Sequence, residues 1–151
     1  MMLTKMTRFG TRAVFDIAYN SSGSPVQIKD IAKRQEMPLK FLEQIFHKLK
    51  KADFINSLRG PGGGYEITKD PSEITVGDIV RAVDEPLDLV CCVSDTEACH
   101  SSEQCPTRPI WEETSKRIKD YLDTVTIADL CADACKKGIK QDLNHPFDYS
   151  I

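Results

Sequence analysis

Long apolar runs are missing from this sequence of 151 residues. No stretch approaches the roughly 18 to 20 apolar residues that a membrane-spanning helix needs. The first residues, MMLTKMTRFGTRAV, lack the unbroken apolar segment of a signal peptide. Internal repeats and low-complexity segments are also missing. We therefore expect a cytoplasmic, soluble protein with no membrane partner. Its length is typical of one domain.

The sequence also lacks the residue patterns of common catalytic sites. It contains no Ser/His/Asp set, no paired-carboxylate motif and no nucleotide-binding loop. The stretch RGPGGG at residues 59–64 is not followed by the Lys-Ser/Thr of a P-loop, and it falls between two predicted strands. We therefore predict that the protein is not an enzyme.

Cysteine is missing from the first 90 residues, and basic residues are scarce in the second half of the chain. Residues 1–82 hold 13 Lys and Arg against 9 Asp and Glu, a net charge of +4, whereas residues 83–151 hold 7 against 14, a net charge of −7. The basic half predicts a polyanionic partner for that half alone, because the attracting field is local. All six cysteines lie after residue 90, where clustered thiols without a secretory signal indicate metal or redox chemistry before disulfides.

Apolar residues recur at helical spacing through most of the first half. This periodicity predicts helices over residues 7–19, 28–34, 38–51 and 76–83. The second and third are short and closely connected, which is typical of a helix-turn-helix. Alternating residues on both sides of the glycine-rich turn then predict a β-hairpin from strands at 54–58 and 65–68. A hairpin that follows a helix-turn-helix is a wing, so we predict a mostly α fold of the winged helix-turn-helix class.

The second half is predicted to contain a long helix. Between residues 110 and 125 the apolar side chains of Trp111, Ile118, Leu122 and Val125 are spaced as in a helix that packs against a partner helix. A shorter helix follows at 127–134. We divide the chain into a DNA-binding domain (1–83), a cysteine-bearing loop (84–109), a dimerisation helix with a terminal helix (110–135), and a tail (136–151).

The third helix has a polar outer face near its start. Lys40, Glu43, Gln44 and Lys48 are left facing solvent when the apolar stripe is buried. Gln44 can form two hydrogen bonds with adenine, and Glu43 can accept a hydrogen bond from the cytosine amino group while repelling phosphate. The alternative is an ordinary surface helix, since solvent-facing charges are common. The helix-turn-helix and hairpin order favours recognition of bases.

The glycine-rich turn is interpreted as the tip of the wing. Glycines such as Gly60 allow the backbone to approach the sugar-phosphate wall closely. Arg59 at the base of the turn can then reach into a minor groove, where narrow A·T-rich sequence concentrates negative potential. Its alternative role is a surface cation that pairs with Glu66.

The spacing Cys92-x6-Cys99-x5-Cys105 is the main feature of the second half. Structural zinc sites usually use closer C-x2-C pairs, so the wide spacing favours a loop around an iron–sulfur cluster. Free or reversibly disulfide-bonded thiols are the alternative. Cys91 and His100 each adjoin one of these cysteines. Neighbouring side chains in an extended chain point in opposite directions, so neither residue easily ligates the same cluster as its neighbour. The remaining pair, Cys131 and Cys135, lies one helical turn apart and is interpreted mainly as packing, with a redox role as the alternative.

Three stretches, LEQIFHKLKKADFINSLRGPGGGY, VGDIVRAVDE and the cysteines that run into CPTRPIW, resemble the IscR family of bacterial iron–sulfur cluster assembly regulators, whose relatives include the nitric-oxide sensor NsrR. The similarity covers roughly residues 3–130. It implies a homodimer with a long dimerisation helix that binds double-stranded DNA at a palindromic operator. It also implies an iron–sulfur cluster, for which we expect 2Fe-2S rather than 4Fe-4S.

The resemblance assigns roles to individual residues. It places the cluster ligands at Cys92, Cys99 and Cys105 and the base-reading positions at Lys40, Glu43, Gln44 and Arg59. The family's histidine ligand three residues after the third cysteine is Arg108 here, which stays protonated and cannot coordinate iron. The first cysteine interval is also one residue longer than in familiar members. The fourth ligand therefore stays open among His100, Cys91, Glu103 and a group from the partner subunit.

Overall fold

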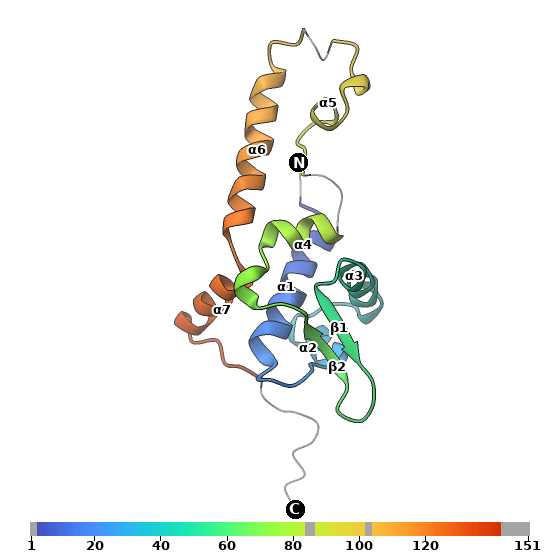
Figure 1. Cartoon of the computed structure of the whole chain (residues 1–151), viewed down its shortest axis with the longest axis vertical. Helices are drawn as coiled ribbons and strands as arrows, with labels where there is room; N and C mark the ends of the chain where they lie inside the picture. Colours follow the sequence, from blue (N-terminus) through green and yellow to red (C-terminus); the bar gives the residue numbers. More distant parts are fainter. Residues whose placement is uncertain (1–2, 84–86, 102–103, 143–151) are drawn as a thin grey trace, which may run out of the picture.

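A computed structural model of the chain describes residues 3–83, 87–101 and 104–142. Four helices build the body of the molecule (Figure 1): α1 (Lys5–Asn20), α2 (Ile28–Arg34), α3 (Leu39–Lys51) and α4 (Val76–Val83). α1 lies at the centre and contacts α2, α3 and α4. The buried side chains that join these helices include Val14, Ile17, Ile31, Leu42, Ile45, Phe46, Leu49, Ile79 and Val83. The predicted helices of the first half are confirmed, with α1 longer at both ends.

Local sequence explains why α1 begins early and packs closely. The Thr4 hydroxyl accepts a hydrogen bond from the Thr7 amide, which satisfies one of the free donors at the start of a helix. At Gly10 an added Cβ would lie only 3.1 Å from Val83 Cγ1. Glycine at this position therefore lets α1 and α4 approach each other.

The predicted hairpin is confirmed, with strands β1 (Ile55–Leu58) and β2 (Gly64–Ile67). They pair antiparallel, with Ile55 opposite Ile67 and Leu58 opposite Gly64. Val26 pairs with Tyr65 and so ties the chain before α2 to the hairpin. These pairings confirm the mostly α fold with a small β-hairpin wing.

α6 (Arg108–Thr124) extends away from the body, and Figure 1 shows α5 (Cys91–Ser94) beside its outer half. The predicted start of this helix at residue 110 is wrong, because Pro109 lies in the first turn rather than before the helix. Proline is tolerated there, since the first-turn amides have no partner within the helix. At its inner end α6 packs on α4.

The cysteine segment is not wholly irregular. Cys91–Ser94 forms one helical turn, and η2 (Thr96–Ala98) forms a 3₁₀ turn that Asp95 caps. The expectation of an extended chain at Cys91 and Cys92 is therefore wrong, and their side chains diverge by about 100° rather than 180°. The predicted stop of the fourth helix at residues 84–86 lies outside the described residues.

The terminal helix α7 (Ile127–Lys136) is two residues longer than predicted and packs against α1 and η1 (Pro71–Glu73). It ends at Lys136, and Gly138 just beyond it has a φ of +69°, which suits the left-handed residue that closes many helices. The chain then returns to α1, where the Tyr19 hydroxyl donates to the Ile139 carbonyl at 2.6 Å and the Asp142 amide donates to Asn20 Oδ1 at 2.8 Å. The tail expected from residue 136 thus starts as ordered chain, and its last part, 143–151, lies outside the described residues.

Candidate DNA-binding surface and cysteine segment

The outer face of α3 is polar, as predicted. Lys40, Glu43, Gln44 and Lys48 are all exposed. Lys40, Gln44 and Lys48 lie four residues apart, and Glu43 lies three residues after Lys40, so the four share one face, opposite the buried stripe of Leu42, Ile45, Phe46 and Leu49. The first turn of α3 holds no acidic residue, and the last holds Lys48, Lys50 and Lys51.

Aromatic packing fixes α3 between α1 and the wing. The rings of Phe46 and Tyr65 meet edge to face with centroids 4.5 Å apart, and those of Phe41 and Phe9 do the same at 5.7 Å. Such pairs stabilise a fixed geometry by about 0.5–1.5 kcal/mol beyond their burial. α3 and the hairpin are therefore held against each other.

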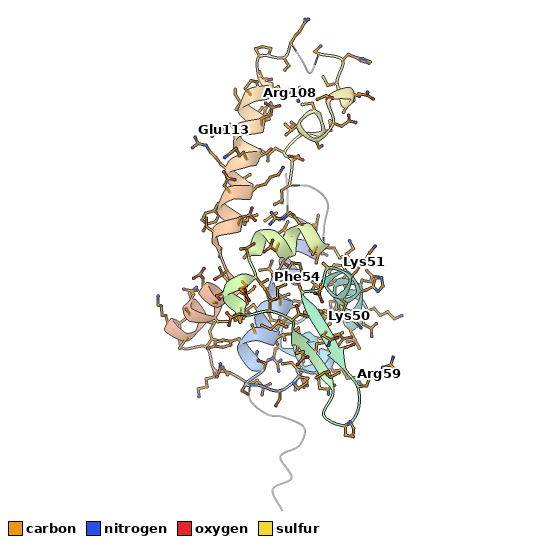
Figure 2. The ribbon with its side chains drawn as sticks, in the orientation of Figure 1. Lys50, Lys51, Phe54, Arg59, Arg108 and Glu113 are labelled. Carbon is orange, nitrogen blue, oxygen red and sulfur yellow. The ribbon has the colours of Figure 1, made fainter. Side chains whose placement is uncertain are left out.

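The wing places an exposed cation at its base. Arg59 follows β1 directly and is exposed, as is Gly60, whose φ is +103°. Figure 2 shows Arg59, Lys50 and Lys51 along one side of the molecule. The Gln27 side chain donates a hydrogen bond to the Gly63 carbonyl, and Lys50 Nζ donates to Ser57 Oγ at 2.8 Å. These two bonds join the wing to α2 and α3.

Lys48 has an additional contact that the sequence did not indicate. Its ammonium donates a hydrogen bond to the Val83 carbonyl at 2.8 Å, at the last residue of α4. A cation at the C-terminus of a helix is favourable, because unpaired carbonyls give that end negative character. Lys48 therefore joins α3 to α4.

The cysteines predicted as cluster ligands occupy the outer segment next to α6. All are free thiols: Cys99 is exposed, and Cys92 and Cys105 are partly exposed. The Thr107 hydroxyl, 3.2 Å from Cys105 Sγ, together with the Thr107 and Arg108 amides, lowers the pKa of that thiol. A lowered pKa favours the thiolate, which is the form that binds metals.

These thiols fit an iron–sulfur cluster in kind but not yet in arrangement. Three thiolates on one segment are the donor type that such clusters use. Within residues 3–83, 87–101 and 104–142, however, no three Cys, His, Asp or Glu side chains come close enough to hold a metal ion. Arg108 forms an ion pair with Glu112 at 2.8 Å and faces its own helix. Cys91 and His100 are exposed, and Glu103 lies outside the described residues.

The segment is anchored at its start by contacts that sequence reasoning missed. The Leu89 amide donates to the buried Ser115 Oγ at 3.1 Å, and Lys119 Nζ lies 2.7 Å from Asp88 Oδ1. Both contacts join residues more than 25 positions apart, so no local pattern could have indicated them. They attach the chain before Cys91 to the middle of α6.

A helix-turn-helix with a polar outer face, followed by a hairpin with a basic base, defines a winged helix-turn-helix DNA-binding protein. Residues 3–133 match the family Rrf2, described as iron-dependent transcriptional regulator. The chain belongs to the Rrf2 family of transcriptional regulators, and it is a DNA-binding regulator rather than an enzyme.

Individual relatives confirm the resemblance to IscR. The chain is 42% identical to the regulator IscR of Serratia proteamaculans over 130 residues, which cover 86% of this chain and 79% of that protein. It is 38% identical to an HTH-type transcriptional regulator of Haemophilus influenzae over 148 residues, covering 98% and 96%. The structure of T. potens IscR superposes with a TM-score of 0.76 at 32% identity, over 93% of each chain. No helix in the described part of the chain is long and apolar enough to cross a membrane.

Proposed function

We propose that the protein is a homodimeric regulator of iron–sulfur cluster assembly genes that binds a palindromic operator in double-stranded DNA. The observation that carries this proposal is the exposed face of Lys40, Glu43 and Gln44 on α3, together with the exposed Arg59 on the wing. In a dimer, two such surfaces would face two half-sites of a palindrome. The division into residues 1–83, 84–109, 110–135 and 136–151 assigns this surface to the first unit.

The long helix α6 supports the homodimer. Trp111 and Ile110 are 41% and 56% exposed, and Ser115 is the buried residue of this helix. Ile110, Trp111, Ile118 and Leu122 lie within one side of the helix at spacings of one to seven residues. A second copy of the helix would cover this apolar side.

Cys92, Cys99 and Cys105 would hold a cluster, for which we favour 2Fe-2S over 4Fe-4S. Bound there, the cluster would supply a redox-sensitive group whose presence depends on iron and sulfide supply. Arg108 does not serve as the fourth ligand, and His100, Cys91, Glu103 and the partner subunit remain the alternatives. Three thiolates with an atypical fourth ligand suit a sensor, because occupancy must respond to supply.

The contacts of the chain suggest how ligation would reach the DNA-binding surface. Ligation would order residues 90–108. The chain just before this segment is fixed to α6 by the contacts of Leu89 with Ser115 and of Asp88 with Lys119. α6 contacts α4, with Arg81 Nη2 2.8 Å from Asp123 Oδ1. The end of α4 in turn accepts the hydrogen bond from Lys48. A shift between two arrangements of this chain of contacts would change the separation of the two recognition helices.

A second candidate is direct thiol sensing by the same DNA-binding dimer. Cys91 and Cys99 are free and exposed, so oxidation to a disulfide with a neighbouring thiol requires no opening of the core. This alternative needs no iron.

Anaerobic purification, followed by iron and sulfide assays and by anisotropy titrations with operator DNA, tests the proposal. We expect a coloured protein with iron and sulfide in fixed ratio to the chain and with DNA affinity that changes when the cluster is removed. Cys92→Ala should abolish the colour and keep the far-UV circular dichroism. A colourless wild type whose DNA binding responds to oxidant alone would favour the thiol sensor.

A further inference from the structure

Two cysteines far from the outer segment face a groove beside α7. The groove has a volume of about 620 Å³ and is lined by Ala18, Tyr19, Cys131, Cys135, Ile139 and Gln141, among others. Both thiols are free, Cys131 partly exposed and Cys135 exposed. The DNA-binding surface and the proposed cluster segment use neither of them.

The two thiols occupy successive turns of one helix face. Residues i and i+4 on a helix have Cβ atoms roughly 5–6 Å apart. A disulfide requires Cβ atoms about 3.5–4.5 Å apart, so the intact helix holds this pair too far apart to oxidise together. A metal ion bound in a line between two thiolates holds the two sulfur atoms roughly 4.6 Å apart, twice the ~2.3 Å length of a zinc–sulfur bond, and rotation about each Cα–Cβ bond lets sulfurs on Cβ atoms 5–6 Å apart reach that separation. The helix spacing therefore suits a bridging ion better than a disulfide.

We propose that Cys131 and Cys135 form a two-coordinate site for a single thiophilic cation of the copper(I) type. Thiolates are soft ligands and select soft cations of this kind. In the described part of the chain no third Cys, His, Asp or Glu joins them to make a three-ligand metal site. Zinc takes four ligands in structural sites and at least three protein ligands in catalytic sites, so this pair disfavours zinc.

Two polar groups that line the same groove, Tyr19 and Asp70, are already engaged. The Tyr19 hydroxyl donates to the Ile139 carbonyl, and Asp70 Oδ1 accepts hydrogen bonds from Ser72 N at 2.8 Å and Ser72 Oγ at 2.6 Å. Binding of copper(I) forms two copper–sulfur bonds and releases two thiol protons to solvent, leaving a complex of charge −1 on α7.

Metal titration of the full chain tests this site. The outer cysteines Cys91, Cys92, Cys99 and Cys105 are replaced by serine to remove the other thiols, and copper(I) is added anaerobically against a chromogenic copper(I) chelator. We expect one copper per chain in this protein. Cys135→Ser should weaken retention by roughly 100-fold or more, because the second sulfur then no longer adds to the first at high effective concentration. Ala132→Ser, on the same groove, should leave retention unchanged.

Three results would overturn the proposal: no copper retained, one copper per two chains, or zinc(II) retained as tightly as copper(I). Cys135 is exposed, so its replacement does not threaten the core. The same substitution in the wild-type chain provides a second measurement and should lower the copper stoichiometry by one. Because the first protein lacks the proposed cluster ligands, its result is independent of the iron–sulfur proposal.

Discussion

Arg34 Nη2 lies 2.6 Å from Asp16 Oδ1, which joins the end of α2 to the middle of α1. Asp16 is completely buried, and its other oxygen accepts a hydrogen bond from Gln35 Nε2 at 2.8 Å. The opposite side of the guanidinium contacts Asp142 at 2.9 Å. The first helix of the helix-turn-helix is thus held by one buried carboxylate and one near the end of the described chain.

Asp16→Ala should destabilise the protein strongly. The substitution leaves the half-buried guanidinium of Arg34 without its main partner, and the loss of a hydrogen bond to a charged group costs about 1.5–3 kcal/mol. Urea unfolding at pH 7, followed by circular dichroism, measures this loss. Asp120→Ala is the matched control, because its pair with Lys116 is exposed on α6 and should contribute about 0.5 kcal/mol or less. Equal losses for the two variants would contradict the role given to Asp16.

Asp78 should make stability depend on pH at the acid end. Burial raises the pKa of Asp78, but hydrogen bonds with Thr75 and the Arg81 cation lower it more, so the pKa lies below its ordinary value of 3.8. A carboxyl group whose pKa is lowered by folding stabilises the protein above the unfolded pKa, and this contribution disappears as pH falls through the folded pKa. Asp78→Asn keeps an oxygen that can accept from the Thr75 amide but removes the negative charge in the first turn of α4, so it should cost about 0.3–1 kcal/mol at pH 7.

The same substitution should cost less at pH 2.5 than at pH 7, because protonation of the Asp78 carboxyl reduces the charge that distinguishes it from asparagine. Urea unfolding at the two pH values makes the comparison. A cost that is equal at both would mean that the charge of Asp78 contributes nothing.

Most of the DNA-binding half followed from local pattern, whereas the contacts that connect its parts did not. The helix-turn-helix could be predicted because Leu42, Ile45, Phe46 and Leu49 recur at helical spacing, and the wing because glycines separate two alternating stretches. The ties from Lys48 to Val83 and from Leu89 to Ser115 join positions 35 and 26 residues apart. Hydrogen bonds across such distances depend on how helices pack, and a single sequence carries no periodic signal for them.

The predicted start of α6 and the predicted extended chain at Cys91 are wrong for a different reason. A helix that starts at residue 110 excludes Pro109, but the first turn of a helix accepts proline. Cys91–Ser94 is too short to show a period, so an isolated turn of this length has no pattern in the sequence. The sequence therefore names candidate ligands by residue type but carries no signal for their arrangement.

Trp111→Glu should convert the proposed dimer to monomers. A carboxylate on the apolar side of α6 would be buried without a partner in the dimer, which costs several kcal/mol, but would face solvent in the monomer. Sedimentation velocity at micromolar concentration measures the mass. Lys116→Glu adds a carboxylate on the opposite side of α6 and should leave the dimer intact. A Trp111→Glu protein that stays dimeric would place the interface elsewhere.

Arg59→Ala and Lys48→Ala should separate contact with DNA from support of the fold. Arg59 is exposed at the base of the wing, so its loss should weaken operator binding and reduce the slope of log K against log salt by about one unit. The Lys48 ammonium already bonds the Val83 carbonyl, so its loss should change the slope less and lower the urea midpoint more.

Glu43→Ala should narrow the affinity difference between operator and unrelated DNA, because the carboxylate no longer repels wrong sequences. Anisotropy titrations between 50 and 200 mM salt measure all three, and an unchanged slope for Arg59→Ala would remove the wing from the DNA interface.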